Sequence, residues 1–316
     1  MPRKPPVLLI SFNRPHLSQR VFERIRIYQP DRLYLAVDGP RAEETHPRDA
    51  AGVAACKDLA QAVDWPCEVF TRFSDVNQGC GRGVSNAITW MFEQESHGII
   101  LEDDCVPEPT FFDYCADLLD RYRDHPQVMH VSGNNFGGEG TAEACAPFSY
   151  AFTRYADLWG WATWARAWAH FRYQIPPPAE VPKSHFIQEG VDRYRQYAQR
   201  DRVLSTRQKT SMWGYQWQYA VLKNRGLCAA PAVNQISNTG FGEEATHTTG
   251  SGSLHAANVP TTPLTFPLSH PPEVVVSPRY NRIYADNVLG TTGRYRKRYL
   301  KRWIRTLLIP GYVPKK

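Results

Sequence analysis

Short, mainly apolar runs alternate with segments of helical periodicity over the first 132 residues. The runs cover residues 7–12, 33–37, 67–72, 98–101 and 128–132. Runs of this length without strict polar alternation are typical of strands buried on both faces of a sheet. Between them, apolar residues recur every three or four positions, most clearly after Pro15 and after Gly83. Strands that alternate with helices predict an α/β fold with a mainly parallel, Rossmann-like sheet flanked by helices.

The pattern changes after residue 132. Residues 133–145 are rich in Gly, Asn and Ala and predict a loop, and residues 176–210 predict a charged helical excursion at the surface. Further on, a helix is predicted over residues 212–223 and a strand over residues 226–233.

Four Trp residues lie within ten positions, and three of them are spaced as on one face of a helix: Trp161, Trp164 and Trp168. This spacing predicts a helix whose indoles mostly pack in the core. The alternative for one or two of the four is stacking on a sugar ring in a binding pocket.

Composition narrows the class of protein. The 316 residues are 42% hydrophobic, yet no run of 18 apolar residues occurs, so no membrane-spanning helix is expected. The N-terminal residues lack the apolar stretch of a signal peptide. The seven Cys form no CxxC pair, which indicates reduced thiols rather than disulfides or a zinc site. We therefore expect a cytoplasmic protein.

The net charge of +6 belongs to the C-terminus. Residues 294–316 contain nine Lys or Arg and no Asp or Glu, so the other 293 residues sum to −3. Apolar and aromatic residues of this segment share one helical face: Tyr295, Tyr299, Leu300, Trp303, Ile304, Leu307 and Leu308. A basic amphipathic helix of this kind suits an anionic membrane surface, here the inner face of the plasma membrane, through residues 294–308. The alternative is that the apolar face packs on the main domain. No nucleic-acid partner is expected.

Three consecutive carboxylates, Glu102, Asp103 and Asp104, end the fourth predicted strand. The carboxyl ends of parallel strands are where open α/β sheets bind ligands. Adjacent acids repel one another unless a cation shares them, and Mg²⁺ or Mn²⁺ prefers carboxylate oxygens together with phosphate oxygens. The triplet therefore indicates a metal site that faces a phosphate-bearing ligand. The alternative is a solvated acidic turn before a helix.

Ligand-type residues also follow the first two strands. Arg14 can pair with a phosphate or stack on a base, and Asp38 can accept hydrogen bonds from a ribose or a base. The segment Gly79-Cys80-Gly81-Arg82-Gly83 opens a helix whose N-terminal amides would attract an anion. It is neither a dinucleotide-binding nor a P-loop motif. A surface ion pair for Arg14 and simple turn chemistry for Asp38 stay open as alternatives.

The order of these residues resembles the GT-A-fold nucleotide-sugar glycosyltransferases, more closely the bacterial HlpA-like relatives of the N-acetylglucosaminyltransferase I family. The resemblance covers residues 6–250 and is strongest in 7–14, 34–39, 98–119 and 158–168. It implies a GT-A-like catalytic domain over residues 1–250, with a nucleotide-binding half, 1–132, and an acceptor half, 133–250. An irregular extension, 251–293, and the basic amphipathic helix and tail, 294–316, would follow.

The resemblance also implies residue roles. The nucleotide-sugar would be held by Phe12, Asn13, Arg14, Asp38, Gly79, Arg82, Glu102 and Asp103. Asp104 matches the direct metal ligand, and His247 in the polar loop 237–248 is a second candidate ligand, because imidazole can bind Mn²⁺. Trp159, Trp161 and Trp213 would close on donor or acceptor.

The chain departs from this pattern at the general base. An acid is expected just after Trp213, where this chain has Gly214. The available replacements are Glu244, which we favour, Glu243 and Asp157. The expected activity is metal-dependent transfer of a sugar from a nucleotide-sugar, with UDP as the expected nucleotide, to a glycan or lipid-linked saccharide. It would invert the anomeric centre if a carboxylate deprotonates the acceptor. The alternatives are a non-catalytic nucleotide-sugar-binding protein and a nucleotidyltransferase.

Overall fold

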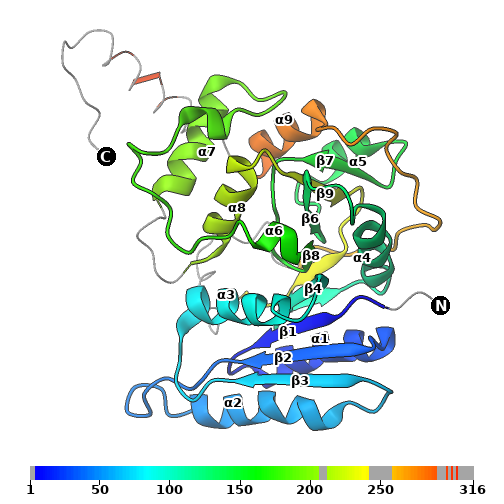
Figure 1. The fold of residues 1–316 in the computed structure, drawn as a ribbon, viewed down its shortest axis with the longest axis vertical. Coiled ribbons are helices and arrows are strands. Elements are labelled where there is room, and N and C mark those ends of the chain that lie inside the picture. The colour runs from blue at the N-terminus through cyan, green and yellow to red at the C-terminus, as the bar shows by residue number, and fades with distance from the viewer. Residues whose placement is uncertain are drawn as a thin grey trace.

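The fold was analysed in a computed structural model, which describes residues 4–205, 212–241 and 258–289 together with residues 297, 300, 301 and 304. A sheet of eight strands in the order β3-β2-β1-β4-β8-β6-β9-β7 runs through the centre, and helices flank it (Figure 1). The sheet is mainly parallel, and β8 and β7 run antiparallel to their neighbours. The predicted α/β, Rossmann-like class is confirmed at this level.

The first part of the chain follows the predicted alternation closely. Its elements are β1 (Val7–Ser11), α1 (Pro15–Tyr28), β2 (Arg32–Val37), α2 (Asp49–Lys57), the 3-10 turn η1 (Asp58–Ala62), β3 (Glu68–Phe73), α3 (Gly79–Phe92) and β4 (His97–Glu102). Strand β1 pairs in parallel with β2 on one side and β4 on the other. The carboxyl ends of these strands therefore meet at one edge of the sheet, as the sequence predicted.

The second part is less regular. Its elements are β5 (Cys105–Pro107), α4 (Thr110–Arg121), β6 (Val128–Ser132), α5 (Glu139–Cys145), β7 (Tyr150–Thr153), β8 (Trp161–Trp164), α6 (Ala165–Trp168), η2 (Lys183–Phe186), α7 (Arg193–Ser205), α8 (Gly214–Lys223), β9 (Leu227–Pro231), β10 (Ile236–Asn238) and α9 (Pro278–Asn287). Strands β5 and β10 form a separate antiparallel ribbon. This ribbon starts directly after the acidic triplet and holds the chain near the edge where β1, β2 and β4 end.

The predicted helix in the Trp-rich segment is wrong in its first half. Residues Trp161–Trp164 form β8, which is inserted between β4 and β6 and pairs antiparallel with both. Only Ala165–Trp168 is helical. The indoles are spaced as on a helix, but the segment completes the hydrogen bonds of two strands that would otherwise have open edges. The prediction that most of these indoles pack in the core is confirmed, because Trp161 and Trp164 are buried.

Two segments predicted as irregular contain helices. Residues Glu139–Cys145, within the predicted loop, form α5, and Pro278–Asn287, within the predicted irregular extension, form α9. The start of α9 has a recognisable cause: Pro278 stands in the first turn, and the Ser277 hydroxyl accepts the Tyr280 amide at 3.2 Å. Helix α9 packs on α5 and β7, so residues 278–287 are part of the main body.

The core lies on both faces of the sheet. Alternate residues of β1 face opposite sides, with Val7 and Leu9 towards α1 and α4, and Leu8 and Ile10 towards α3 and α8. Helical residues that complete the two layers include Phe22 and Phe111 on the first face and Ile88 and Trp217 on the second. Within the described residues, no helix combines the length and the apolar character needed to cross a membrane.

The predicted basic helix over 294–308 lies outside the described residues except at four positions. Two of these, Leu300 and Ile304, are 51% and 39% exposed, and Lys297 and Lys301 are also exposed.

Candidate functional site

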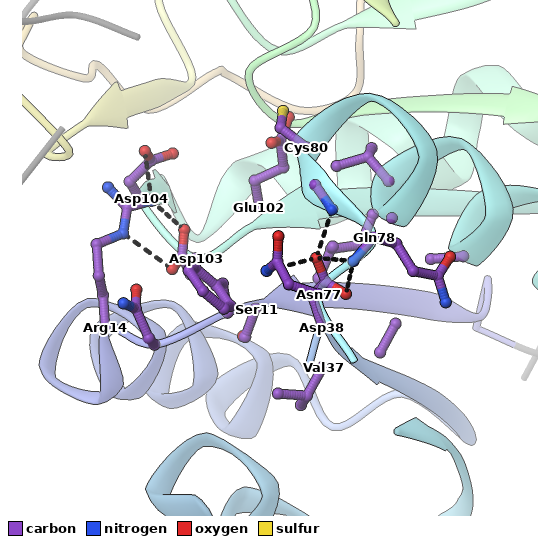
Figure 2. Close-up of a pocket in the computed structure, with 18 of the residues that line it drawn as sticks. Ser11, Arg14, Val37, Asp38, Asn77, Gln78, Cys80, Glu102, Asp103 and Asp104 are labelled. Atoms are coloured by element: carbon purple, nitrogen blue, oxygen red, sulfur yellow. Dashed lines mark hydrogen bonds and ion pairs between the residues drawn. The ribbon is translucent and has the colours of Figure 1, made fainter. Parts of the chain in front are cut away.

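A cavity of about 840 Å³ opens where β1, β2, β3 and β4 end (Figure 2). Ligand pockets commonly have this volume, and this edge of an α/β sheet is where they form. Nine of the residues predicted to bind line it: Phe12, Asn13, Arg14, Asp38, Gly79, Glu102, Asp103, Asp104 and Trp159. The structure adds lining residues that the sequence did not single out, among them Arg41, Arg48, Arg72, Asn77, Cys80, Asn238 and Gly240.

Arg14 clamps two of the three consecutive carboxylates. Its Nε donates to Asp103 Oδ2 at 3.1 Å, and its Nη2 donates to Asp103 Oδ1 and, at 3.0 Å, to Asp104 Oδ2. Figure 2 shows these contacts, and it shows Glu102 extending instead towards Cys80. Burial disfavours the charged guanidinium, but the two carboxylates outweigh burial and raise the pKa of Arg14. The ion pair that stood as the alternative for Arg14 therefore forms, but as a partly buried clamp in the cavity lining and not at the surface.

Two acids of the triplet, Glu102 and Asp103, have raised pKa values. Burial, followed by the charges of Asp104 and Asp103, raises the pKa of Glu102 to about 8. Burial also raises the pKa of Asp103, although Arg14 opposes that shift. Arg14 bonds to Asp103 and Asp104 and not to Glu102, so one guanidinium cannot neutralise all three carboxylates when they are ionised. A cation at this wall would favour their ionised forms.

Asp38 is engaged with the start of α3. Its carboxylate accepts the backbone N–H groups of Gln78 at 2.9 Å and Gly79 at 3.1 Å, and the Asn77 side-chain amide at 3.1 Å. The predicted anion at the N-terminus of α3 is therefore Asp38 itself, a residue of this chain. Gly83 gives the carboxylate room, because a Cβ there would lie 3.3 Å from Asp38 Oδ2, closer than most Cβ contacts.

Another part of the cavity lining joins the aromatic ring of Phe12 to the guanidinium of Arg41. Arg41 lies 5.3 Å from the centroid of the Phe12 ring and is held by Asp49, which also accepts Asn13 Nδ2 at 2.7 Å. Hydrogen bonding from Arg41 is the main cause that lowers the pKa of Asp49 to about 2. A flat, electron-poor surface of this kind suits a nucleobase. Arg48 and Arg72 add positive charge to the cavity and form no ion pair within the described parts of the chain.

Only one of the three predicted closing Trp residues reaches the cavity. Trp159 lines it and is flanked by Phe136 and Phe241, with ring centroids 5.1 Å and 5.6 Å away. Trp161 and Trp213 instead stack on each other at 5.8 Å in the core beneath α8. The helical pattern of indoles gave no means of telling a cavity Trp from a core Trp.

Arg82 also points elsewhere. It is exposed, does not line the cavity, and lies over the ring of Tyr173 at 4.7 Å. Arg82 is thus kept apart from the acidic triplet. Its position in the glycine-rich segment did not predict this separation.

None of the predicted replacement bases lies in the described cavity wall. Asp157 is buried in the interior, where its carboxylate accepts the Tyr284 hydroxyl and burial raises its pKa to about 7. Glu243 and Glu244, and the candidate metal ligand His247, fall outside the described residues. Gly214 faces Leu158, whose Cδ1 would lie 2.4 Å from a Cβ at that position.

The residues fit a hard divalent cation of the kind that phosphate-binding sites use. Mg²⁺ typically takes one or two carboxylates and completes its coordination with phosphate oxygens and water. Asp104 has a partly exposed side chain, and its Oδ2 keeps a lone pair beyond its bond to Arg14, whereas Oδ1 accepts both the Asn238 amide and the Cys105 thiol. A ready-made cluster of three or more His, Cys, Asp or Glu ligands does not occur among the described residues.

Two residues next to Asp104 were missed by the sequence analysis. Asn238 donates to Asp104 Oδ1 at 3.2 Å, and Gly240 packs directly against the same carboxylate. They lie in a polar segment whose only sequence signal was its composition, and they reach the acid through the pairing of β10 with β5. Comparison with protein-family models and with curated proteins gives no match for this chain, so the chemistry of the site is argued from its own residues.

Proposed function

We propose that this protein is a metal-dependent glycosyltransferase that uses a nucleotide-sugar, with UDP as the favoured nucleotide. The observation that carries the proposal is the contrast within one cavity. Part of its lining has an excess of carboxylate over guanidinium, and another part has Phe12 beside Arg41. A nucleoside diphosphate attached to a sugar offers a base for the part with Phe12 and Arg41, and phosphates that approach the carboxylates only with a cation.

Asp104 would hold Mg²⁺ or Mn²⁺. When bound, that ion would stabilise the negative charge that develops on the leaving diphosphate. Arg14 fixes the orientation of Asp103 and Asp104, because its fork bonds to both. Trp159 offers an aromatic surface beside Asp104 and Gly240 for the apolar face of a sugar ring. The acceptor would be a saccharide. It could be free or lipid-linked, since the Trp159 ring would contact the sugar and not the lipid attached to it.

The test is a thermal-shift screen of nucleotide-sugars with Mn²⁺, followed by measurement of released nucleoside diphosphate. A matching donor should raise the melting temperature by mass action. Asp104→Ala should lose the Mn²⁺-dependent part of this shift and keep its melting temperature without ligand. Glu43→Ala, an exposed acid elsewhere in the chain, should behave as the wild type. Full Mn²⁺-dependent binding by Asp104→Ala would rule out this site. Release of pyrophosphate from a nucleoside triphosphate would instead indicate a nucleotidyltransferase.

A specific observation favours a second candidate, a nucleotide-sugar-binding protein without transfer activity. Where the resemblance calls for an acid, Gly214 abuts Leu158, and Asp157 is buried away from the cavity. Tight donor binding with no turnover over a range of saccharide acceptors would support this candidate. Any acceptor-dependent release of nucleoside diphosphate would exclude it.

We further propose that residues 294–308 bring the protein to an anionic membrane surface at the cytoplasmic face. Support comes from the nine basic and no acidic residues of 294–316 and from the exposure of the apolar Leu300 and Ile304 close to Lys297 and Lys301. Such a location would suit a lipid-linked acceptor.

A further inference from the structure

The side chain of Asn238 is almost fully buried and links the Asp104 carboxylate to the backbone amide of Gly240. Its exposed fraction is 4%, its Nδ2 donates to Asp104 Oδ1 at 3.2 Å, and its Oδ1 accepts the Gly240 amide at 2.9 Å. The amide orientation is determined by these partners, because a carboxylate can only accept and a backbone N–H can only donate.

The backbone around Asn238 is fixed as well. Asn238 pairs with Cys105 in the β5–β10 ribbon, and the Thr239 amide donates to the Asp104 carbonyl at 2.8 Å. The Asn258 amide donates to the Asn238 carbonyl at 2.9 Å. Asn238 therefore presents its side chain from a rigid support.

Gly240 brings a further constraint. A Cβ at this position would lie 2.1 Å from Asp104 Oδ2 and 2.7 Å from Asp104 Cβ. Only glycine lets the backbone approach the carboxylate this closely. Asp104 is thus confined by Arg14 at Oδ2, by Asn238 at Oδ1 and by the Gly240 backbone.

We propose that Asn238 is a positioning residue that sets the orientation of the Asp104 carboxylate for a divalent cation. This inference rests on the proposed function. Hydrogen bonds from neighbouring residues to a ligating carboxylate orient it, and their loss typically weakens metal binding by about 10- to 100-fold. Asn238 acts through Asp104 and makes no contact with the cation itself.

The two hydrogen bonds of Asn238 can be separated by substitution. Asn238→Ser leaves a hydroxyl that can still accept the Gly240 amide two residues on, as Ser does in such turns, but it is too short to reach Asp104. Asn238→Ala removes both bonds. Thr239→Val is the matched control, because the Thr239 hydroxyl donates to the backbone carbonyl of Asp104, at 3.5 Å, and not to its carboxylate.

The experiment measures Mn²⁺ affinity by titration in the presence of saturating UDP, and UDP affinity without metal. Asn238→Ser and Asn238→Ala should both weaken Mn²⁺ binding by about 10-fold or more. Their metal-free UDP affinity should stay within about twofold of the wild type, since the Asn238 side chain bonds to Asp104 and Gly240, whereas Arg41 is held by Asp49 against Phe12. Thr239→Val should match the wild type in both measurements.

Wild-type Mn²⁺ affinity in Asn238→Ser, with loss in Asn238→Ala, would show that Asn238 serves only the turn and would overturn the inference. Equal losses of Mn²⁺ and metal-free UDP affinity would do the same, since they would reflect general damage to the cavity. Asp104→Ala separates this failure from failure of the proposed function. If Asp104→Ala binds Mn²⁺ as the wild type does, the metal site itself is wrong.

Discussion

The carboxylate of Asp38 accepts the backbone N–H of Gly79, the first residue of α3, at 3.1 Å. The residues come from different elements, the end of β2 and the start of α3. Asp38 thus caps a helix that lies 41 positions further along the chain. Its negative charge also lies at the positive end of the helix dipole.

Loss of this cap should be visible as a loss of stability. We expect Asp38→Ala to lower the free energy of unfolding by about 2 kcal/mol, because two backbone amides of the α3 start lose a charged acceptor. Urea unfolding followed by circular dichroism would measure it. The control is Asp75→Ala, which removes an exposed acid from the segment between β3 and α3. Unchanged stability with weakened UDP binding would instead mean that Asp38 serves the ligand alone.

Two Trp residues close in sequence should respond differently to truncation. Trp161 is fully buried, so Trp161→Ala should cost about 3–5 kcal/mol of stability. Trp159 lines the cavity, so Trp159→Ala should weaken nucleotide-sugar binding by about tenfold and leave UDP binding nearly unchanged. Isothermal titration of each variant with UDP and with the matching UDP-sugar tests this. Equal losses for both ligands would remove Trp159 from sugar recognition.

The buried Asp157 should make stability depend on pH. Its folded-state pKa of about 7 lies above the ordinary value of 3.8, so the folded protein holds a proton that the unfolded chain releases in this window. The contribution of Asp157 to stability is therefore present below about pH 4 and is lost as the pH rises to 7. Asp157→Asn should gain about 2–4 kcal/mol relative to the wild type between pH 4 and pH 8, since one pKa unit is worth about 1.4 kcal/mol.

Urea unfolding of both proteins across this range measures the difference. His130, whose Nε2 donates to the Asp157 carbonyl at 2.8 Å, titrates in the opposite sense. Burial lowers its pKa to about 3, so its contribution is lost as the pH falls below about 6.5. That effect is common to both proteins and cancels in the comparison. A difference that stays constant with pH would contradict the assignment.

Membrane association should depend on lipid charge and on the C-terminal segment. We expect the full chain to co-sediment with vesicles containing phosphatidylserine and not with neutral vesicles, and to be released by salt. A variant lacking residues 294–316 should stay in the supernatant in both cases. Equal sedimentation of the two proteins, or indifference to lipid charge, would exclude the membrane surface as a partner.

The part of the site that the sequence predicted comes from the ends of buried parallel strands. The apolar run before Glu102 and the short strands before Arg14 and Asp38 are local signals, and parallel strands bring their carboxyl ends together. No such local signal existed for Asn238. It reaches Asp104 through a pairing between residues more than 130 positions apart, which hydrophobic periodicity does not encode.

The Trp-rich segment shows the opposite failure, a local signal that tertiary structure overrides. The spacing of Trp161 and Trp164 fits a helix, yet the hydrogen-bonding needs of β4 and β6 draw these residues into a strand. The hydrogen bond from the start of α3 to Asp38 is also non-local. An acid that suits a ligand suits a helix N-terminus equally well, so the sequence did not distinguish these two roles.

Strand β8 has a consequence for how the chain folds as it is synthesised. In the sheet order, β8 separates β4 from β6, so the block β3-β2-β1-β4 ends in an open edge until residues 161–164 emerge from the ribosome. That edge belongs to the strand that leads into the acidic triplet. An unpaired strand invites mispairing with other chains. We therefore expect nascent chains that have emerged from the ribosome only as far as residues 132–160 to be the most aggregation-prone and the most dependent on chaperones.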